Sequence, residues 1–298
     1  MATFAKSSFN ALSYATFRPT YPPQIFARVL AYHSPSSRDL AVDLGCGHGL
    51  ISRSMGAYFT RVLGTDPSLS MIEQARSTTP AGEYGNVDFR QARAEELSFL
   101  REAEADVVVA GQAAHWFDYS KTWPELARVV RKGGTLAFWG YKDNIFVDYP
   151  AATKVLDKYC YGAENMGPYW EQPGRNILRG LYRDIVPPES EWEDVQRIEY
   201  EPSLDGRGMK QGRGELLMGK RLKLGEVEGY VRTFSAFVNW KAESEERSRE
   251  EGGQGDIVDR MFDEMREVES KWEKAGEAWR DLEVENEWGS VLLLARRR

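Results

Sequence analysis

Residues 40–49, LAVDLGCGHG, decide the fold of this chain. The apolar run at their start is typical of a short buried strand, and a helix-like segment follows them. Between strand and helix, Gly45, Gly47 and Gly49 leave three alternate positions of the turn without side chains. Because the backbone amides at a helix N-terminus can face a ligand closely, this strand, turn and helix start predict a cofactor pocket.

The spacing of the glycines separates this turn from the dinucleotide-binding fingerprint. That fingerprint reads G-x-G-x-x-G, with an acid about 20 residues on. Here the pattern is G-x-G-x-G, and Asp43 lies two residues before the first glycine. A dehydrogenase is therefore the weaker interpretation, and an ordinary tight turn in an α/β protein stays open as a further alternative.

Length and composition limit the kind of protein this is. A chain of 298 residues suits one large domain, or one nucleotide-type core with an insertion, and a net charge of −7 argues against a nucleic-acid partner. No apolar run is long enough to span a bilayer, and the N-terminus lacks the apolar core of a secretory signal. Two cysteines and three histidines in no metal-ligand spacing predict neither a disulfide framework nor a bound metal. We expect a cytoplasmic monomer without membrane partners.

Strand-like and helix-like segments alternate along residues 24–140. The second strand, residues 61–66, ends in Asp66, where a carboxylate can accept hydrogen bonds from the ribose hydroxyls of a cofactor. The alternative is that residues 66–68 only begin the next helix. The strand at residues 105–110 is wholly apolar apart from Asp106, as expected for a central parallel strand. Five such units predict a doubly wound α/β sheet.

The remaining segments predict an arm, an insertion and a closing hairpin. Residues 1–23, rich in aromatics and ending in prolines, are either a lid over the cofactor pocket or a surface arm. Residues 141–255 predict a partly helical, partly irregular cap. The apolar stripe from Ile257 to Trp279 predicts one continuous helix. Two strands around Gly289 predict an antiparallel hairpin, so residues 24–140 and 256–298 would form a seven-stranded core.

With these elements in place, the chain resembles the class I S-adenosylmethionine (SAM)-dependent methyltransferases, whose fold is Rossmann-like. More narrowly, it is similar to the fungal trans-aconitate methyltransferases. The narrower match is carried by residues 18–22 (RPTYP), 114–118 (AHWFD), 139–141 (WGY), 146–150 (FVDYP), 167–175 (GPYWEQPGR) and 230–233 (YVRT), together with residues 43–47 (DLGCG).

The resemblance implies SAM as cofactor and a set of residues that hold it. These are Asp43, Gly45, Cys46, Gly47, Asp66, Ala94, Glu95, Gln112 and Ala113. Many relatives carry an acid at the position of Arg93 to hold the adenine amino group. Since an arginine cannot take that role, we expect backbone groups of residues 94 and 95 to hold the adenine.

The matched segments also suggest how an acceptor is held. A carboxylate acceptor is ionised at neutral pH and needs no general base, so catalysis would consist of positioning and the removal of water. Arginine forks suit a carboxylate, although each can equally pair with a surface acid. We expect catalytic roles for His115 and Arg175, and acceptor binding by Arg18, Tyr21, Trp139, Tyr141, Trp170 and Arg232.

Two alternatives to carboxylate methylation stay open. If the acceptor is a hydroxyl or phenol of a secondary metabolite or a lipid-like molecule, His115 can act as its general base. If turnover has been lost, the chain is a SAM-binding regulatory protein.

Overall fold

The computed structural model describes residues 16–33, 37–204 and 212–298. Most of the predicted lid arm, residues 1–15, and much of the glycine- and arginine-rich segment near residue 210 therefore lie outside the described residues. Among those described, no helix combines the length and the apolar character that crossing a bilayer requires.

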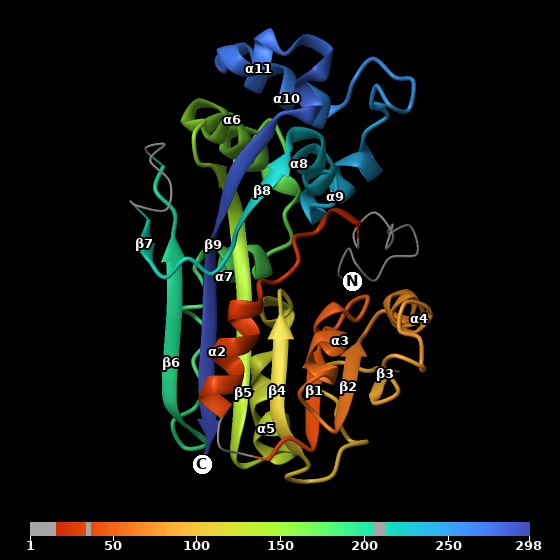
Figure 1. The fold of residues 1–298 in the computed structure, drawn as a ribbon, viewed down its shortest axis with the longest axis vertical. Coiled ribbons are helices and arrows are strands. Elements are labelled where there is room, and N and C mark those ends of the chain that lie inside the picture. Colours follow the sequence, from red (N-terminus) through yellow and green to blue (C-terminus); the bar gives the residue numbers. More distant parts are fainter. Residues whose placement is uncertain (1–15, 34–36, 205–211) are drawn as a thin grey trace. The chain divides into compact units, whose positions relative to one another are not determined.

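The first five strands form the parallel part of a twisted sheet (Figure 1). β1 pairs in parallel with β2 on one side and with β4 on the other, while β3 adds to β2 and β5 adds to β4. This arrangement confirms the predicted doubly wound, Rossmann-like sheet. The bounds are β1 (Leu40–Leu44), β2 (Arg61–Asp66), β3 (Val87–Gln91), β4 (Ala105–Gly111) and β5 (Val130–Phe146).

The complete strand order is β3-β2-β1-β4-β5-β9-β6-β7, and β8 pairs with β9. Figure 1 draws the last part of β9 with its arrow opposite to that of β4. The short β7 and β8 extend the sheet beyond the seven predicted strands. These later strands are β6 (Trp192–Glu201), β7 (Arg213–Gly214), β8 (Gly219–Lys223) and β9 (Glu283–Arg297).

The closing hairpin predicted around Gly289 is wrong. β9 is one 15-residue strand, and Gly289 lies inside it. The backbone does not turn there because the residues on both sides, Trp288 and Ser290, are buried in the sheet. A hairpin also needs loop residues between its strands, and a single glycine supplies too few. The strand that was expected before Gly289 is instead β6, far earlier in the chain.

Helices connect the strands and make up much of the rest of the chain. α2 (Pro23–His33) precedes β1, and between β1 and β5 lie α3 (Leu50–Gly56), α4 (Leu69–Ser77), η2 (Ala114–Trp116) and α5 (Tyr119–Val129). After β5 come α6 (Pro150–Tyr161), η3 (Gly167–Tyr169), α7 (Gly174–Arg179), α8 (Leu224–Val231), α9 (Ser235–Glu243), α10 (Ile257–Val268), α11 (Ser270–Lys274) and η5 (Gly276–Asp281).

The single helix predicted for residues 257–279 is also wrong. The helical segment breaks at Glu269, which has an extended backbone and caps α11, and again at Gly276, whose φ is +55°. Val268, which belonged to the predicted apolar stripe, is 46% exposed. The apolar stripe is divided among α10, α11 and η5, and Trp272 and Trp279 are still buried.

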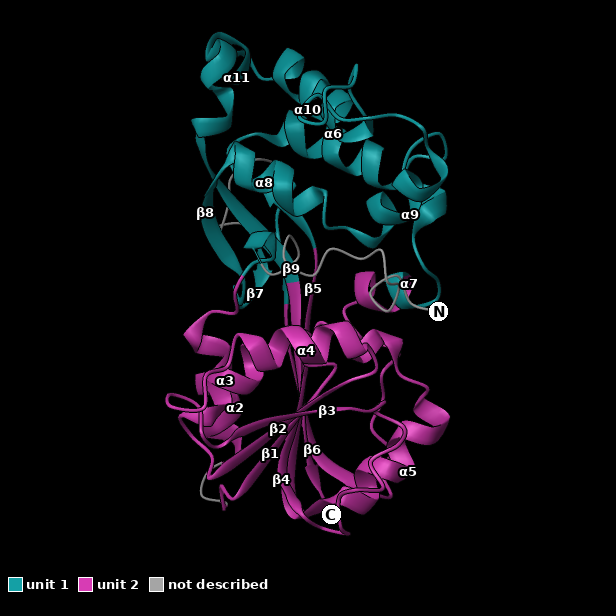
Figure 2. Ribbon diagram, turned by 90° about the vertical axis from the view of Figure 1, so that its right-hand side faces the viewer, with its two compact units in different colours: residues 1–19, 143–175, 200–289 teal, residues 20–142, 176–199, 290–298 magenta. Residues whose placement is uncertain are grey.

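The chain divides into two compact units (Figure 2). Unit 1 comprises residues 1–19, 143–175 and 200–289, and unit 2 comprises residues 20–142, 176–199 and 290–298. Two of the differences from the predicted boundaries are large. Residues 256–289 fall in unit 1, where α10 packs on α6, and residues 176–199 fall in unit 2. There Trp192 joins the core that contains Val108 and Leu293.

Candidate functional site

The glycine turn after β1 has the backbone that only glycine adopts readily. Gly45, Gly47 and Gly49 have φ values of +66°, +52° and +86°. A Cβ on Gly45 would lie 2.5 Å from the Cβ of Ala113, so this glycine lets the turn pack against the residues that follow β4. A Cβ on Gly47 would meet no atom within 4 Å. The turn is therefore packed on one side and bare on the other.

Asp43, at the end of β1, carries an incompletely bonded buried carboxylate. Its side chain is fully buried, and Oδ2 accepts a 2.6 Å hydrogen bond from the hydroxyl of Ser52 in α3. Its Oδ1 is buried and has no hydrogen-bond partner among the described residues. Burial raises the pKa of Asp43 to about 7. The carboxylate is thus poised to take a proton, or a donor from a ligand, at neutral pH.

Asp66, at the end of β2, joins the glycine turn to the next helix. Its Oδ2 accepts the N–H of Gly47 at 3.0 Å, and its Oδ1 accepts the N–H of Ser68 at 2.8 Å. Burial raises the pKa of Asp66. The helix cap is Ser68, whose hydroxyl accepts from the N–H of Met71 in α4. The capping role considered for residues 66–68 thus belongs to the serine, and Asp66 fixes the turn.

The segment after β3 lies in a turn, with Ala94 buried. The side chain of Glu95 accepts the N–H of Asp118 at 2.8 Å, which ties this segment to the start of α5. Arg93 forms a 3.6 Å ion pair with Glu95. Arg93 and Glu95 thus both use their side chains within the protein.

Gln112 directly follows β4, and its side-chain amide forms hydrogen bonds with the backbone of β5. Its Nε2 donates to the carbonyl of Tyr141 at 2.7 Å, and its Oε1 accepts the N–H of Tyr141 at 2.8 Å. Its φ is +57°, an uncommon value for a residue other than glycine. The amide therefore positions Tyr141, and only the backbone of Gln112 remains to contact a cofactor.

Three residues predicted for the acceptor form one aromatic group in unit 2. The ring of Tyr21 meets that of Trp139 edge-on, with centroids 5.6 Å apart, and lies 6.3 Å from that of Tyr141. Trp139 and Tyr141 stand at the end of the parallel part of β5, and both are buried. Phe26 of α2 packs on the other side of Trp139, with ring centroids 6.0 Å apart.

His115, in η2, is buried against a tyrosine that was not among the predicted residues. Its Nδ1 lies 3.2 Å from the hydroxyl of Tyr182, which also donates to the carbonyl of Trp139 at 3.4 Å. Tyr182 is fully buried, and burial raises the pKa of its phenol far above the usual value. Nothing in the local sequence marks Tyr182, because it meets His115 only through the fold.

Arg175, in unit 1, pairs with a carboxylate of the chain itself. Its Nη2 donates to Asp143, and its Nε donates to the hydroxyl of Tyr161 at 2.9 Å, which in turn donates to Asp143 at 2.6 Å. The guanidinium stacks 3.9 Å from the ring centroid of Trp170. Nη1 makes no hydrogen bond to the described residues. Asp143 and Tyr161 were not predicted; neither lies in the matched segments.

Arg18 lies over the aromatic rings next to Trp170, also in unit 1. Its guanidinium is 5.3 Å from the ring centroid of Tyr230 and 5.7 Å from that of Phe234, and it donates to the carbonyl of Thr233. Phe234 in turn contacts Trp170, with centroids 5.6 Å apart. Two of the three predicted arginines, Arg18 and Arg175, thus share one aromatic wall.

The structure corrects the prediction that Arg232 binds the acceptor, because its guanidinium forms ion pairs with acidic side chains of unit 1. It forms ion pairs with Asp256 at 2.6 Å, Glu228 at 3.1 Å and Asp259 at 3.3 Å. Only 18% of its side chain is exposed. Of the two interpretations of this arginine, an ion pair within the protein is therefore the better one. Two of its partners, Asp256 and Asp259, lie at the start of α10.

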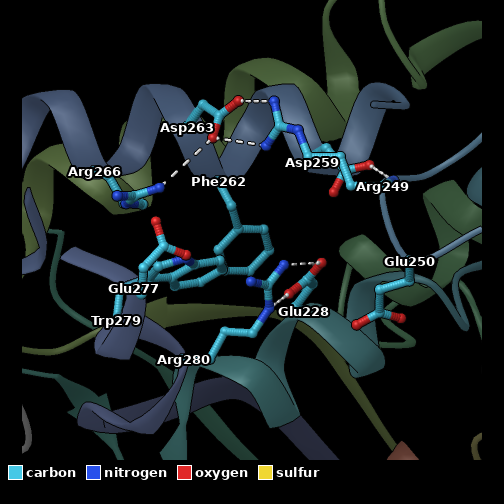
Figure 3. Close-up of a pocket in the computed structure, with 10 residues that line it drawn as sticks. All are labelled: Glu228, Arg249, Glu250, Asp259, Phe262, Asp263, Arg266, Glu277, Trp279 and Arg280. Atoms are coloured by element: carbon cyan, nitrogen blue, oxygen red, sulfur yellow. Dashed lines mark hydrogen bonds and ion pairs between the residues drawn. The ribbon is translucent and has the colours of Figure 1, made fainter. Parts of the chain in front are cut away.

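A pocket of about 460 Å³ lies beside this charged cluster (Figure 3). Arg280 donates to Glu228 through Nε at 2.8 Å, and Arg249 forms two hydrogen bonds with Asp263. Trp279 lies on the same side, with Arg280 4.4 Å from its ring centroid. The arginines that line the pocket are therefore paired with acids of the same pocket. It contains none of the residues predicted for the cofactor or acceptor.

Comparison with known proteins finds methyltransferases. Residues 42–138 match a family model described as "Methyltransferase domain". CRG1 of Saccharomyces cerevisiae, a proposed S-adenosylmethionine-dependent methyltransferase, is 27% identical over 89% of this chain and 90% of its own length. A proposed methyltransferase of Dictyostelium discoideum is 33% identical over 59% of this chain and 63% of its own. A solved structure from Anaeromyxobacter dehalogenans, proposed to be a type II methyltransferase, is 26% identical with a TM-score of 0.65, covering 94% of this chain and 98% of that one.

The turn residues fit the cofactor of this family. SAM carries an ammonium group and ribose hydroxyls, and the buried Oδ1 of Asp43 still lacks a donor among the described residues. The backbone at Gly47 is bare, and the carboxylate of Asp66 keeps lone pairs beyond the two backbone bonds that it accepts. With the parallel sheet, the match over residues 42–138 and these relatives, the chain carries a SAM-dependent methyltransferase domain with SAM as the methyl donor.

Proposed function

We propose that the enzyme methylates a carboxylate of a small acid to give a methyl ester. The observation that carries this proposal is the pair Arg18 and Arg175 on the shared aromatic wall of Trp170 and Phe234. Guanidinium groups held on aromatic faces keep a fixed orientation and suit the plane of a carboxylate. The resemblance of residues 167–175 to trans-aconitate methyltransferases points to the same acceptor class.

In this proposal Arg175 binds the acceptor through Nη1 alone. Its Nε and Nη2 are held by Tyr161 and Asp143, so its direction is fixed before the acceptor arrives. Bound SAM supplies an activated methyl group on a sulfonium, and the protein supplies alignment. Because a carboxylate is ionised at neutral pH, no side chain has to remove a proton, and His115 only orients the acceptor by a hydrogen bond.

The other predicted residues keep their roles as parts of the same proposal. The cofactor is held by residues 43–47, Asp66, the backbone of residues 94–95 and the backbone of residues 112–113. Tyr21, Trp139 and Tyr141 wall the acceptor side of the sheet edge, where ligands of open α/β sheets bind.

A second candidate is methylation of a hydroxyl or phenol, which the geometry of His115 favours. The imidazole of His115 is buried next to Tyr182. A hydroxyl or phenol acceptor needs a general base to remove its proton, and in this candidate His115 is that base. A regulatory protein that binds SAM without turnover is the candidate from another class.

The test is methyl transfer from isotopically labelled SAM to a panel of di- and tricarboxylic acids, phenols and alcohols, read by mass spectrometry. We expect base-labile methyl esters from the acids, and loss of activity in Arg175→Ala. The matched control is Arg260→Ala, which removes an exposed arginine of the same unit that pairs with Glu246. Ethers from the phenols, or activity in Arg175→Ala equal to that of the control, would replace the ester assignment with the second candidate. SAM binding with no product from any acceptor would favour the regulatory protein.

A further inference from the structure

Tyr182 makes two contacts that link His115 to the end of the parallel part of β5. The phenol lies 3.2 Å from Nδ1 of His115 and 3.4 Å from the carbonyl oxygen of Trp139. A Cβ on residue 140 would lie 2.5 Å from this phenol oxygen, so Gly140 leaves the space that the hydroxyl fills. The same carbonyl of Trp139 also accepts the N–H of Gln112.

The backbone that carries Tyr182 has an unusual conformation. Leu181 and Tyr182 have φ values of +53° and +57°, in the left-handed region that residues other than glycine rarely adopt. Both side chains are fully buried. Two such residues in succession cost free energy that the surrounding packing must offset, and conformations of this kind collect at functional sites. This observation is independent of the hydrogen bonds, and it singles out the same tyrosine.

The direction of the hydrogen bonds depends on where the single proton of the Tyr182 hydroxyl goes. The carbonyl of Trp139 can only accept, and it lies within reach of this hydroxyl. With the proton on that contact, the phenol oxygen accepts from Nδ1–H of His115. The raised pKa of Tyr182, caused by burial, keeps the phenol protonated at every physiological pH. Hydrogen bonds that point in the same direction along a chain also strengthen one another.

We propose that Tyr182 is the positioning residue of His115. Its hydroxyl holds the imidazole as the Nδ1–H tautomer, so that the lone pair of the ring lies on Nε2. This inference rests on the proposed function only for the contact of His115 with the acceptor. The tautomer itself is a property of the protein without any acceptor.

The first measurement is the tautomer of His115 in the full chain labelled with ¹⁵N-histidine. Long-range proton–nitrogen NMR spectra distinguish the two ring nitrogens, and the chain has only three histidines. His115→Gln identifies the signal. We expect a protonated Nδ1 in the wild type and a mixture of tautomers in Tyr182→Phe. A wild-type ring with its proton on Nε2 overturns the proposal, and this result needs no variant that might unfold.

The second measurement is kinetic and uses a matched control. Tyr182→Phe should lower kcat a fewfold, and by no more than His115→Gln does, with the Kd of SAM unchanged, because the lost hydrogen bond acts only through the histidine. Tyr32→Phe removes a buried hydroxyl of the same unit that donates to the carbonyl of Asp194 at 2.8 Å, and it should leave kcat unchanged. In a His115→Gln background, Tyr182→Phe should cause no further loss, because the tyrosine acts through the histidine. Additive losses, or an equal loss in Tyr32→Phe, would overturn the proposal.

These outcomes separate the inference from the proposed function. If the NMR signals show the Nδ1–H tautomer and its dependence on Tyr182, but no acid is methylated, the positioning role stands and the ester assignment fails. If acids are methylated while His115 carries its proton on Nε2, the ester assignment stands and the positioning role fails.

Discussion

The buried carboxylate of Asp43 predicts that SAM binding depends on pH. Burial raises the pKa of Asp43 to about 7 in the protein without ligand. The ammonium group of SAM is expected to meet Oδ1, which has no other donor among the described residues. A nearby positive charge favours the ionised carboxylate, so binding should release a proton. The affinity for SAM should therefore rise as the pH rises through about 7.

The size of the effect follows from the ionised fraction of Asp43. With a pKa of about 7, roughly a tenth of the molecules carry the ionised carboxylate at about pH 6 and roughly half at about pH 7. If SAM binds only the ionised form, its Kd at pH 6 should be about five times that at pH 7. At pH 6 each binding event should release about 0.9 proton.

The assay is calorimetric titration between about pH 5.5 and 7.2, in buffers with different heats of ionisation. In this range the amino group of the ligand, with a pKa near 8, keeps its charge. The control is Asp43→Asn, which can keep the hydrogen bond from Ser52 but cannot ionise. Its affinity should be about 10- to 100-fold weaker than that of the wild type near pH 8, and it should not vary with pH over this range.

The same pKa predicts an effect on stability that is opposite in direction to the effect on binding. In the unfolded chain the Asp43 carboxyl would lose its proton near its ordinary pKa of 3.8, whereas the folded protein holds it up to about pH 7. The folded state thus binds more protons between these limits, so this residue's contribution to the free energy of unfolding falls as the pH rises through them. Asp43→Asn should therefore not lower Tm near pH 8. A wild-type Kd that is constant from pH 6 to 7, or a Kd that rises with pH, would refute the reasoning.

Three further predictions concern the glycine turn, the arginines and the histidine. Gly47→Val should weaken SAM binding at least tenfold, since it fills the bare side of the turn, and its left-handed backbone should cost only about 1–2 kcal/mol of stability; unchanged SAM affinity by calorimetry would contradict the assignment of the turn. Arg175→Ala should lower kcat/KM for the acid about 100-fold or more with SAM binding intact, whereas Arg232→Ala should lower the free energy of unfolding by about 3–5 kcal/mol, because it leaves Asp256 and Asp259 without their ion-pair partner and Glu228 with Arg280 alone; a reversal of these two effects in steady-state kinetics and denaturant unfolding would contradict the assignment. His115→Ala should lower kcat only a fewfold with an acid acceptor, and a pH-dependent loss of all turnover would point to a hydroxyl or phenol.

The parallel part of the fold was predictable because each signal is local. Along residues 40–140, each apolar strand lies within a few residues of the glycine turn or the polar residue that follows it. The two ends of β9 were predicted as separate strands because Gly289 separates an alternating run from an apolar one, and a glycine at such a place often marks a break. In the fold β8 pairs with residues 283–287, and β9 lies between β5 and β6, so this information lies far away in the chain.

The acceptor side was less predictable because its pairings are long-range. The sequence singled out three arginines but could not rank them. Arg232 meets Asp256 and Asp259, more than 20 residues away, and Arg175 meets Asp143, 32 residues away. Tyr182 shows the same limit, since only the packing brings it to His115.

The position of β9 in the sheet has a consequence for how the protein is made. Residues 290–298 belong to unit 2, and β9 lies between β5 and β6 in the strand order. As the ribosome releases the chain from its N-terminus, β1 to β6 are available early, but the strand that separates β5 from β6 comes last. Until then β5 presents an unpaired edge, on which another nascent chain could add a strand. We expect a nascent chain stalled before residue 283 to need chaperone protection, and a protein shortened by its last nine residues to aggregate.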